Sequence, residues 1–269
     1  VYKRQGLNFE FFHPWMERNP INHLFLRTSG TKDKFGLALE HSAFTPDVIS
    51  DLEIRYGDRP YASALVLKSM KISDWKDKGM RLKSSFLLGI MGPSSLGGAG
   101  QIWIHEATGN WKPQGWDNQI RDDVIINYNI GIEKLLLNLN NYFSFYGESR
   151  VRFGTLFTDL NLGASATLGL VKSPLKENSR NSKFQIYLFC KGVTNLVGYN
   201  SLLQGGVFNR NSPYTISTSD INRLTAQYYY GLVIKSGLFY IEYYQTSMSR
   251  EFKSGDPEDW GGFKIGVRI

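Results

Sequence analysis

Apolar and polar residues alternate along most of this chain, in stretches that are typical of β-strands. Near the C-terminal end, Phe239, Ile241 and Tyr243 fall on one face of such a stretch, whereas Glu242 and Thr246 fall on the other. The first face is the more apolar, so we expect it to contact lipid if the protein lies in a membrane. Eleven segments are predicted to be strands, and they comprise residues 6–12, 35–41, 63–72, 81–91, 123–137, 142–155, 158–172, 183–196, 221–235, 238–250 and 262–269.

The lengths of these segments indicate a membrane barrel. Many of them are longer than the ~5–6 residues usual in globular sheets, and such lengths suit tilted spans of a bilayer. A tight connection at residues 236–237 and a long polar one at 205–219 occur together, as in outer-membrane barrels. We therefore predict an all-β fold, an antiparallel transmembrane β-barrel. A soluble β-barrel or sandwich with aromatic core residues is the alternative that periodicity leaves open.

Composition agrees with a single barrel domain covering residues 1–269. Aromatic residues make up 14% of the chain and charged residues only 20%, which suits strands and turns better than helical bundles. No stretch of about eighteen apolar residues occurs, so a transmembrane helix is excluded. Bacterial single-chain barrels have even numbers of strands, so we expect one further strand before Val1. The N-terminal residues lack the basic, apolar and small-residue series of a signal peptide.

Charge and cysteine content narrow the possible partners. The formal net charge is +7, and the lysines and arginines are scattered along the chain, which suits an anionic partner such as nucleic acid or a phosphorylated lipid surface. No nucleic-acid-binding motif supports the first of these. The single cysteine, Cys190, excludes an intramolecular disulfide, and we expect it to be a small buried apolar residue.

Two segments interrupt the alternation. Residues 15–33 are predicted to form a polar loop, whereas residues 92–119 combine a Gly-Pro stop, a glycine-rich turn and a helical pattern at about 98–110. In this predicted helix Gln101 and His105 stand at i and i+4, so we expect both to project from one face. The serines that precede the helix are expected to cap it.

His105 is the strongest catalytic candidate of the chain. Hydrolysis near neutral pH needs a base that takes a proton from water, and histidine is the residue type whose ordinary pKa lies in that range. The reaction also needs a donor or a positive charge for the developing oxyanion. An isolated histidine is more often a satisfied loop residue, but Gln101 on the same face favours a functional role.

Four motifs occur in a joint order and spacing that is specific. They are GDRPYA at 57–62, GPSSLG at 92–97, Gln101 four positions before His105, and GWDNQ at 115–119. Together they resemble the outer-membrane lipid A 3′-O-deacylase family.

The resemblance covers residues 6–119 by motif and the remainder by strand pattern alone. It implies a twelve-stranded barrel in the outer membrane of a Gram-negative bacterium, with lipid A or lipopolysaccharide as its partner. It also implies a calcium-dependent enzyme that hydrolyses the ester between an acyloxyacyl chain and the glucosamine of lipid A. His105 and Gln101 correspond to the family's catalytic histidine and neighbouring glutamine.

Further candidates for substrate contact surround this helix in sequence. Asp58 and Arg59 precede a proline at the mouth of a strand, where an ion pair can brace a loop or the arginine can meet a phosphate or the ester carbonyl. We favour bracing. Trp111 and Trp116, together with Trp103, can wall an acyl groove, although tryptophans at a bilayer interface would give the same pattern.

The chain departs from the family's pattern at the metal site. The family's Asn-Asp pair and threonine on its first two strands would fall before Gly6, and its glutamate six residues after the histidine is Trp111 here. Calcium takes roughly six or more oxygen ligands, carboxylates among them. The metal ligands are therefore unknown from the sequence, and calcium rests on the resemblance alone.

Three hypotheses follow. The first is an outer-membrane lipid A deacylase in which His105 activates water. The second is a non-catalytic barrel of the same family that binds lipopolysaccharide or has a structural role in the outer membrane. The third, an unrelated porin-like channel, is disfavoured because a conducting pore needs no helix with this histidine and glutamine.

Overall fold

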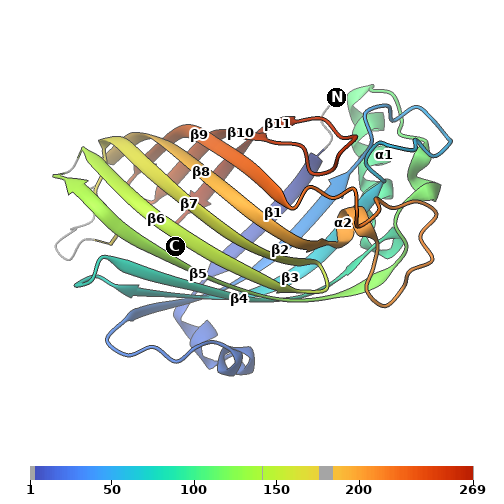
Figure 1. Cartoon of the computed structure of the whole chain (residues 1–269). Coiled ribbons are helices and arrows are strands. Elements are labelled where there is room, and N and C mark those ends of the chain that lie inside the picture. The colour runs from blue at the N-terminus through green and yellow to red at the C-terminus, as the bar shows by residue number, and fades with distance from the viewer. Residues whose placement is uncertain (1–3, 141, 176–183, 269) are drawn as a thin grey trace.

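One antiparallel sheet of eleven strands, joined in chain order, makes up most of the computed structural model, which describes residues 4–140, 142–175 and 184–268. The sheet curls into a nearly closed barrel (Figure 1). This confirms the predicted all-β antiparallel barrel and its eleven strands. The strands are β1 (Arg4–Phe12), β2 (Lys32–Phe44), β3 (Ala62–Trp75), β4 (Met80–Met91), β5 (Asp123–Leu139), β6 (Phe143–Gly154), β7 (Phe157–Leu170), β8 (Phe184–Asn200), β9 (Leu224–Ser236), β10 (Phe239–Met248) and β11 (Glu258–Val267).

The strand ends are the part that differs from the prediction. β2 begins at Lys32 and ends at Phe44, three positions beyond the predicted 35–41 on each side. Its terminal residues pair with β3 without following the apolar alternation. Residue 269, at the end of the last predicted strand, lies outside the described residues, as does residue 183 at the start of the eighth.

The two faces of the barrel wall have opposite character. Phe239, Ile241 and Tyr243 of β10 are exposed on the outside, whereas Glu242 and Thr246 are buried on the inside, as the alternation predicts. Inside the barrel, Lys83 of β4 pairs with Glu133 of the neighbouring β5 at 2.6 Å, and Lys191 of β8 pairs with Glu148 of β6, two strands away, at 2.7 Å. An apolar outside and a polar inside are the arrangement of a transmembrane barrel.

Cys190 corrects one expectation. It lies on the outer face of β8, in register between Leu188 and Gly192, and is exposed rather than buried. The residue type suggested burial, but its position in the alternation places it with the residues that point away from the barrel interior.

At one end of the barrel the interior is closed by an apolar cluster. Val66 of β3, Met91 of β4 and Ile125 of β5 meet Leu202 of the short helix α2 (Ser201–Gln204) there. This cluster fills part of the interior with apolar side chains, where the wall of a conducting channel would be polar. Two cavities of about 250 and 390 Å³ lie further inside, and their walls are polar and charged.

The helix α1 (Gly97–Thr108) lies at the same end of the barrel as the loops that join β2 to β3 and β8 to β9 (Figure 1). The connection between β1 and β2 leaves from the opposite end. It contains the 3₁₀ helices η1 (Pro14–Arg18) and η2 (Pro20–Leu24) where a polar loop was predicted. Among the described residues, no helix has the length and apolarity needed to cross a membrane.

Candidate active site

The N-terminal turn of α1 packs closely on the outer wall of the barrel. Gly97 lies against Ser63 of β3, and a Cβ at Gly97 would overlap the Cβ of Ser63 and come within 2.5 Å of its Oγ. Gly98 faces the ring of Trp116, with the nearest atom 3.0 Å from a Cβ built there. The glycine-rich stretch is therefore needed for close approach of the helix backbone to the wall.

The serines before α1 do not cap it, contrary to the prediction. The N-cap is Leu96, in the left-handed conformation with φ 62°, and it makes no side-chain capping bond. Ser95 Oγ instead lies 2.6 Å from Ser63 Oγ and 2.7 Å from the carbonyl oxygen of Gly92. His41 of β2 donates from Nε2 to the carbonyl of Ser95 at 3.0 Å. These contacts fasten the start of the helix to the wall.

Gln101 holds α1 to the loop that follows it. Its side chain is 3% exposed, and its Oε1 accepts a hydrogen bond of 2.8 Å from Nε1 of Trp116. Trp116 belongs to the 3₁₀ helix η4 (Gly115–Asn118), and its ring packs against that of Tyr61 with the centroids 5.0 Å apart and the planes tilted by 55°. Burial raises the pKa of Tyr61 to about 12. The structure thus places Trp116 in a packed cluster instead of on the wall of a groove.

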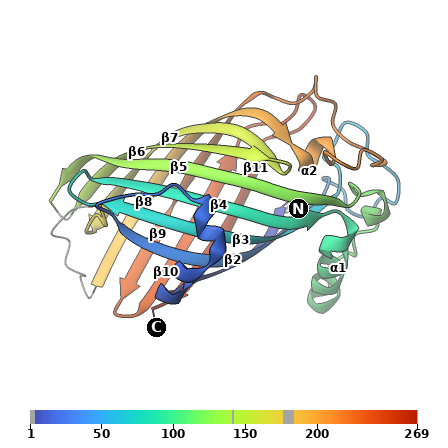
Figure 2. The same ribbon diagram turned by 90° about the horizontal axis from the view of Figure 1, so that it is seen from below.

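His105 lies one turn further along α1 than Gln101. The helix α1 projects away from the barrel wall (Figure 2). The ring of His105 is half-exposed, and Nδ1 lies 2.6 Å from the carbonyl oxygen of Trp111. A carbonyl only accepts, so Nδ1 carries the proton and the lone pair of the neutral ring is on Nε2. Gln101 and His105 both face the segment that follows α1, where Gln101 contacts Trp116 and His105 contacts Trp111, but the first is buried and the second is half-exposed.

Apolar side chains surround His105 on the free part of the helix. Trp103 and Ile104 are exposed, and the side chain of Trp111 is 84% exposed. Glu106, the carboxylate nearest in sequence, forms an ion pair of 2.5 Å with Lys112. The described residues therefore give His105 a backbone carbonyl as its partner and no carboxylate.

Arg59 is buried in a charged cluster inside the barrel. It is 2% exposed, its Nη1 lies 2.6 Å from Glu251 and 3.1 Å from Glu258, and its guanidinium lies 4.5 Å above the ring of Phe44. Arg4 of β1 contacts the same two glutamates, each at 2.5 Å. The sequence did not single out Arg4, Glu251 or Glu258, because nothing local to any of them indicates partners so far along the chain.

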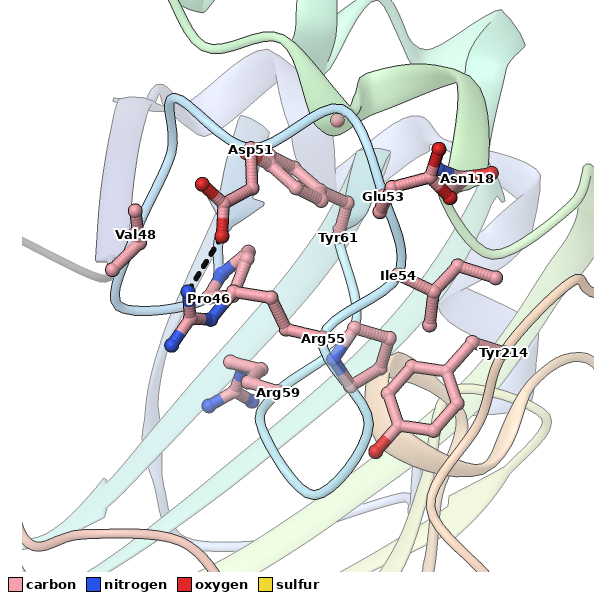
Figure 3. A pocket seen from close by; sticks show the side chains of 12 residues that line it. Pro46, Val48, Asp51, Glu53, Ile54, Arg55, Arg59, Tyr61, Asn118 and Tyr214 are labelled. Carbon is pink, nitrogen blue, oxygen red and sulfur yellow. Dashed lines mark hydrogen bonds and ion pairs between the residues drawn. The ribbon is translucent and has the colours of Figure 1, made fainter.

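Asp58 holds the loop between β2 and β3 through hydrogen bonds from backbone N–H groups, and not through an ion pair with Arg59. Its carboxylate accepts from the backbone N–H of Asp47 at 2.9 Å and from that of Arg59 at 2.6 Å. A shallow hollow lies beside it, lined by Asp51, Arg55 and Tyr214 among others (Figure 3). Nη1 of Arg55 forms an ion pair there with Asp51 at 2.6 Å. The hollow has a volume of about 10 Å³, which has room for water at most.

The donor set around α1 does not fit calcium. Among the described residues, no group of three or more histidine, cysteine, aspartate or glutamate side chains is placed to hold a metal ion. Two carboxylates of this region have other partners: Glu106 of α1 pairs with Lys112, and Asp122 accepts from the N–H and the hydroxyl of Ser94 at 2.7 and 2.9 Å. Calcium takes roughly six or more oxygen ligands, so these side chains alone do not form its site.

Residues 3–269 match the model of the family described as "Outer membrane protein LpxR". The chain belongs to the LpxR family. It is therefore a barrel of the bacterial outer membrane, and its family is the lipid A deacylase family that the four motifs resemble.

The solved structure of LpxR from Salmonella typhimurium has the same fold as this family member. The TM-score is 0.79 with 18% sequence identity, and the alignment covers 98% of this chain and 88% of that chain. No curated protein matches the sequence.

Proposed function

We propose that this LpxR-family barrel hydrolyses an ester-linked acyl chain of lipid A, at the 3′ position, with His105 as the general base. The observation that carries the proposal is the hydrogen bond from Nδ1 of His105 to the carbonyl of Trp111 at 2.6 Å. It fixes the tautomer in which Nε2 has a free lone pair. Nε2 is thus ready to accept a proton from water on the half-exposed side of the ring.

The reaction can be written with this base alone. Nε2 takes a proton from water as the water oxygen attacks the ester carbonyl. The tetrahedral intermediate then expels the sugar oxygen, which takes the proton back from the imidazolium. The products are a free fatty acid and a sugar hydroxyl, and the base is regenerated.

The location of α1 suits a substrate that approaches within the membrane plane. The helix lies outside the barrel and not in its lumen (Figures 1 and 2). Trp103, Ile104 and Trp111 are exposed beside His105 and offer apolar surface for an acyl chain. Gln101 acts in this proposal as a positioning residue, because its contact with Trp116 anchors the helix.

Calcium dependence is expected from the family resemblance alone. The described side chains do not fit it, so no step of the proposed reaction is assigned to it. Arg59 and Asp58, which the sequence offered as substrate contacts, are assigned here to support of the barrel interior and the loop.

A non-catalytic barrel of the same family is the second candidate. The observation in its favour is that Trp111 stands where the resemblance expects a glutamate, and His105 has no carboxylate partner among the described residues. Such a protein would bind lipopolysaccharide at α1 without releasing an acyl chain.

Mass spectrometry of lipid A separates the two candidates. Cells that express the complete reading frame should contain lipid A that lacks a 3′-linked acyl chain, and His105→Ala should abolish this loss. His23→Ala, which changes an exposed histidine of η2, is the matched control and should leave release intact. Intact lipid A from the unaltered protein would favour the non-catalytic barrel, and full release by His105→Ala would reject His105 as the base.

A further inference from the structure

The connection between β1 and β2, residues 13–31 and here called the strap, folds back along the outer wall of the barrel (Figures 1 and 2). Its buried Phe25 lies with its ring centroid 6.3 Å from that of Tyr128 on β5. Tyr128 points outward, since it alternates with Asn127, which is buried in the barrel interior. The strap therefore covers a part of the surface that would otherwise face lipid.

The wall beneath the strap is polar. Lys71 of β3 points outward, and its Nζ lies 3.1 Å from the carbonyl of Leu26, 3.0 Å from Thr28 Oγ1 and 3.0 Å from Asp33 Oδ2. Thr28 Oγ1 also lies 3.2 Å from the hydroxyl of Ser73. Polar groups exposed to hydrocarbon are costly, and the strap gives each of these a partner.

The level of the strap along the barrel axis follows from β3. The same strand meets α1 at Ser63 and the strap at Lys71. Eight residues at ~3.3 Å each, on a strand tilted by about 40°, span about 20 Å along the axis, close to the ~25 Å apolar band of such barrels. Outward-facing Leu65 and Leu67 lie between the two contacts. The strap thus lies about 20 Å along the axis from α1, on the other side of the apolar surface between the two contacts.

Irregular backbone does not persist where it faces hydrocarbon, because its N–H and C=O groups would lack partners. The 3₁₀ turns of the strap therefore suit the headgroup layer, where water and lipid headgroups supply partners. The free side of the strap has matching chemistry. Trp15 is 56%, Leu24 53% and Leu26 52% exposed, and Arg18 and Arg27 are exposed beside them.

We propose that the strap is a lipid-binding element that lies in the phospholipid headgroup layer of the leaflet away from α1. Trp15, Leu24 and Leu26 enter the acyl boundary, and Arg18 and Arg27 contact lipid phosphates. Two observations favour phospholipid as the ligand. The strap is continuous with the lipid-facing wall, and its apolar face is flanked by cationic side chains, as in interfacial anchors. The proposal does not depend on catalysis by His105.

Depth-dependent fluorescence quenching tests this placement. The complete protein is reconstituted in vesicles of phosphatidylethanolamine and phosphatidylglycerol, with an NBD fluorophore on Leu24→Cys in a Cys190→Ser background. The same fluorophore on native Cys190, exposed on the wall of β8, is the reference for the hydrocarbon region. A headgroup nitroxide lipid should quench the strap fluorophore most, and a deep acyl-chain nitroxide should quench the Cys190 fluorophore most.

Each other quenching result would overturn the proposal. Strongest quenching by aqueous iodide would place the strap in water, and strongest quenching by the deep nitroxide would place it in hydrocarbon. Protection from all three quenchers would mean that protein, such as a second copy of the chain, covers the strap.

Charge reversal tests the phosphate contact separately. Arg27→Glu should shift the emission of the Leu24 fluorophore to the red and reduce quenching by the headgroup nitroxide. Lys253→Glu, in an exposed loop at the α1 end, is the matched control and should change neither. Equal effects of the two substitutions would contradict a local contact between Arg27 and lipid phosphate.

Discussion

Arg4 and Glu258 lie 254 positions apart in the sequence, yet Nε of Arg4 donates to Oε2 of Glu258 at 2.5 Å. The contact joins β1 to β11, the two strands at the ends of the sheet order. Glu251 and Arg59 complete the cluster, with Arg59 Nη1 2.6 Å from Glu251. Among the described residues no ladder pairs β1 with β11, so this cluster is what connects the two edges at the α1 end.

Loss of Arg59 is expected to destabilise the barrel strongly. Arg59→Met leaves the buried Glu258 and the partly buried Glu251 with Arg4 as their one remaining cationic partner among the described residues. Breaking a buried ion pair from one side costs about 3–5 kcal/mol, because a charge remains without compensation. The unfolding temperature in detergent, followed by heat-modifiable gel migration, should fall accordingly.

Lys83→Met provides the control for that experiment. Lys83 also pairs with a glutamate of a neighbouring strand, Glu133 at 2.6 Å, but its side chain is 51% exposed. An exposed pair contributes about 1 kcal/mol or less. If both substitutions lowered the unfolding temperature equally, burial of the Arg59 cluster would not be the source of its contribution.

This cluster also shows what the sequence could and could not predict. The strands and their outward faces follow from a period-two pattern that is local, so the alternation of Phe239, Ile241 and Tyr243 was sufficient. The partners of Arg4 are set by the curvature of the whole sheet. No pattern around Arg4 itself carries that information.

Close packing of α1 on the wall predicts opposite effects for two neighbouring glycines. Gly97→Ala would force a Cβ into Ser63, so the helix should move away from the wall. Gly100→Ala meets nothing within 4 Å and should stabilise the helix by up to about 1 kcal/mol. Hydrogen exchange of the amides in α1 should accelerate in the first variant and slow in the second. Faster exchange in both variants would mean that helix propensity and the contact with Ser63 do not determine how α1 packs on the barrel wall.

The candidate site was predicted in part. The helix was placed at about 98–110 and is found at Gly97–Thr108, because its glycine-rich start and its helical pattern are local signals. The i, i+4 spacing predicted that Gln101 and His105 project from one face, and both side chains contact the segment that follows α1. Their burial differs, because one helical turn advances about 5.4 Å along the axis and α1 leaves the wall within that distance. The direction of the helix relative to the barrel is a tertiary property that the spacing does not contain.

The hydrogen bond between Gln101 and Trp116 predicts a measurable coupling. Gln101→Ala leaves the buried Nε1–H of Trp116 without its acceptor, which costs about 1–3 kcal/mol. Trp116→Phe removes the donor, so adding Gln101→Ala to it should cost less than Gln101→Ala alone. Hydrogen exchange of residues 97–119 in the two single variants and the double variant gives the coupling energy. Additive effects would show that the bond does not anchor α1.

Cys190 offers a direct test of which face of the wall contacts lipid. Its thiol is exposed on the outer face of β8, between Leu188 and Gly192, and so should lie in the hydrocarbon of the outer membrane. A thiol in hydrocarbon is accessible to an apolar maleimide that partitions into the membrane, and inaccessible to a sulfonated maleimide that stays in water. We expect labelling in vesicles by the first reagent alone, and labelling by both after unfolding in denaturant. Ser219→Cys in a Cys190→Ser background, in the exposed β8–β9 loop, is the control that both reagents should modify. Rapid reaction of native Cys190 with the sulfonated reagent would place this face of β8 in water and overturn the assignment of the outer wall to lipid.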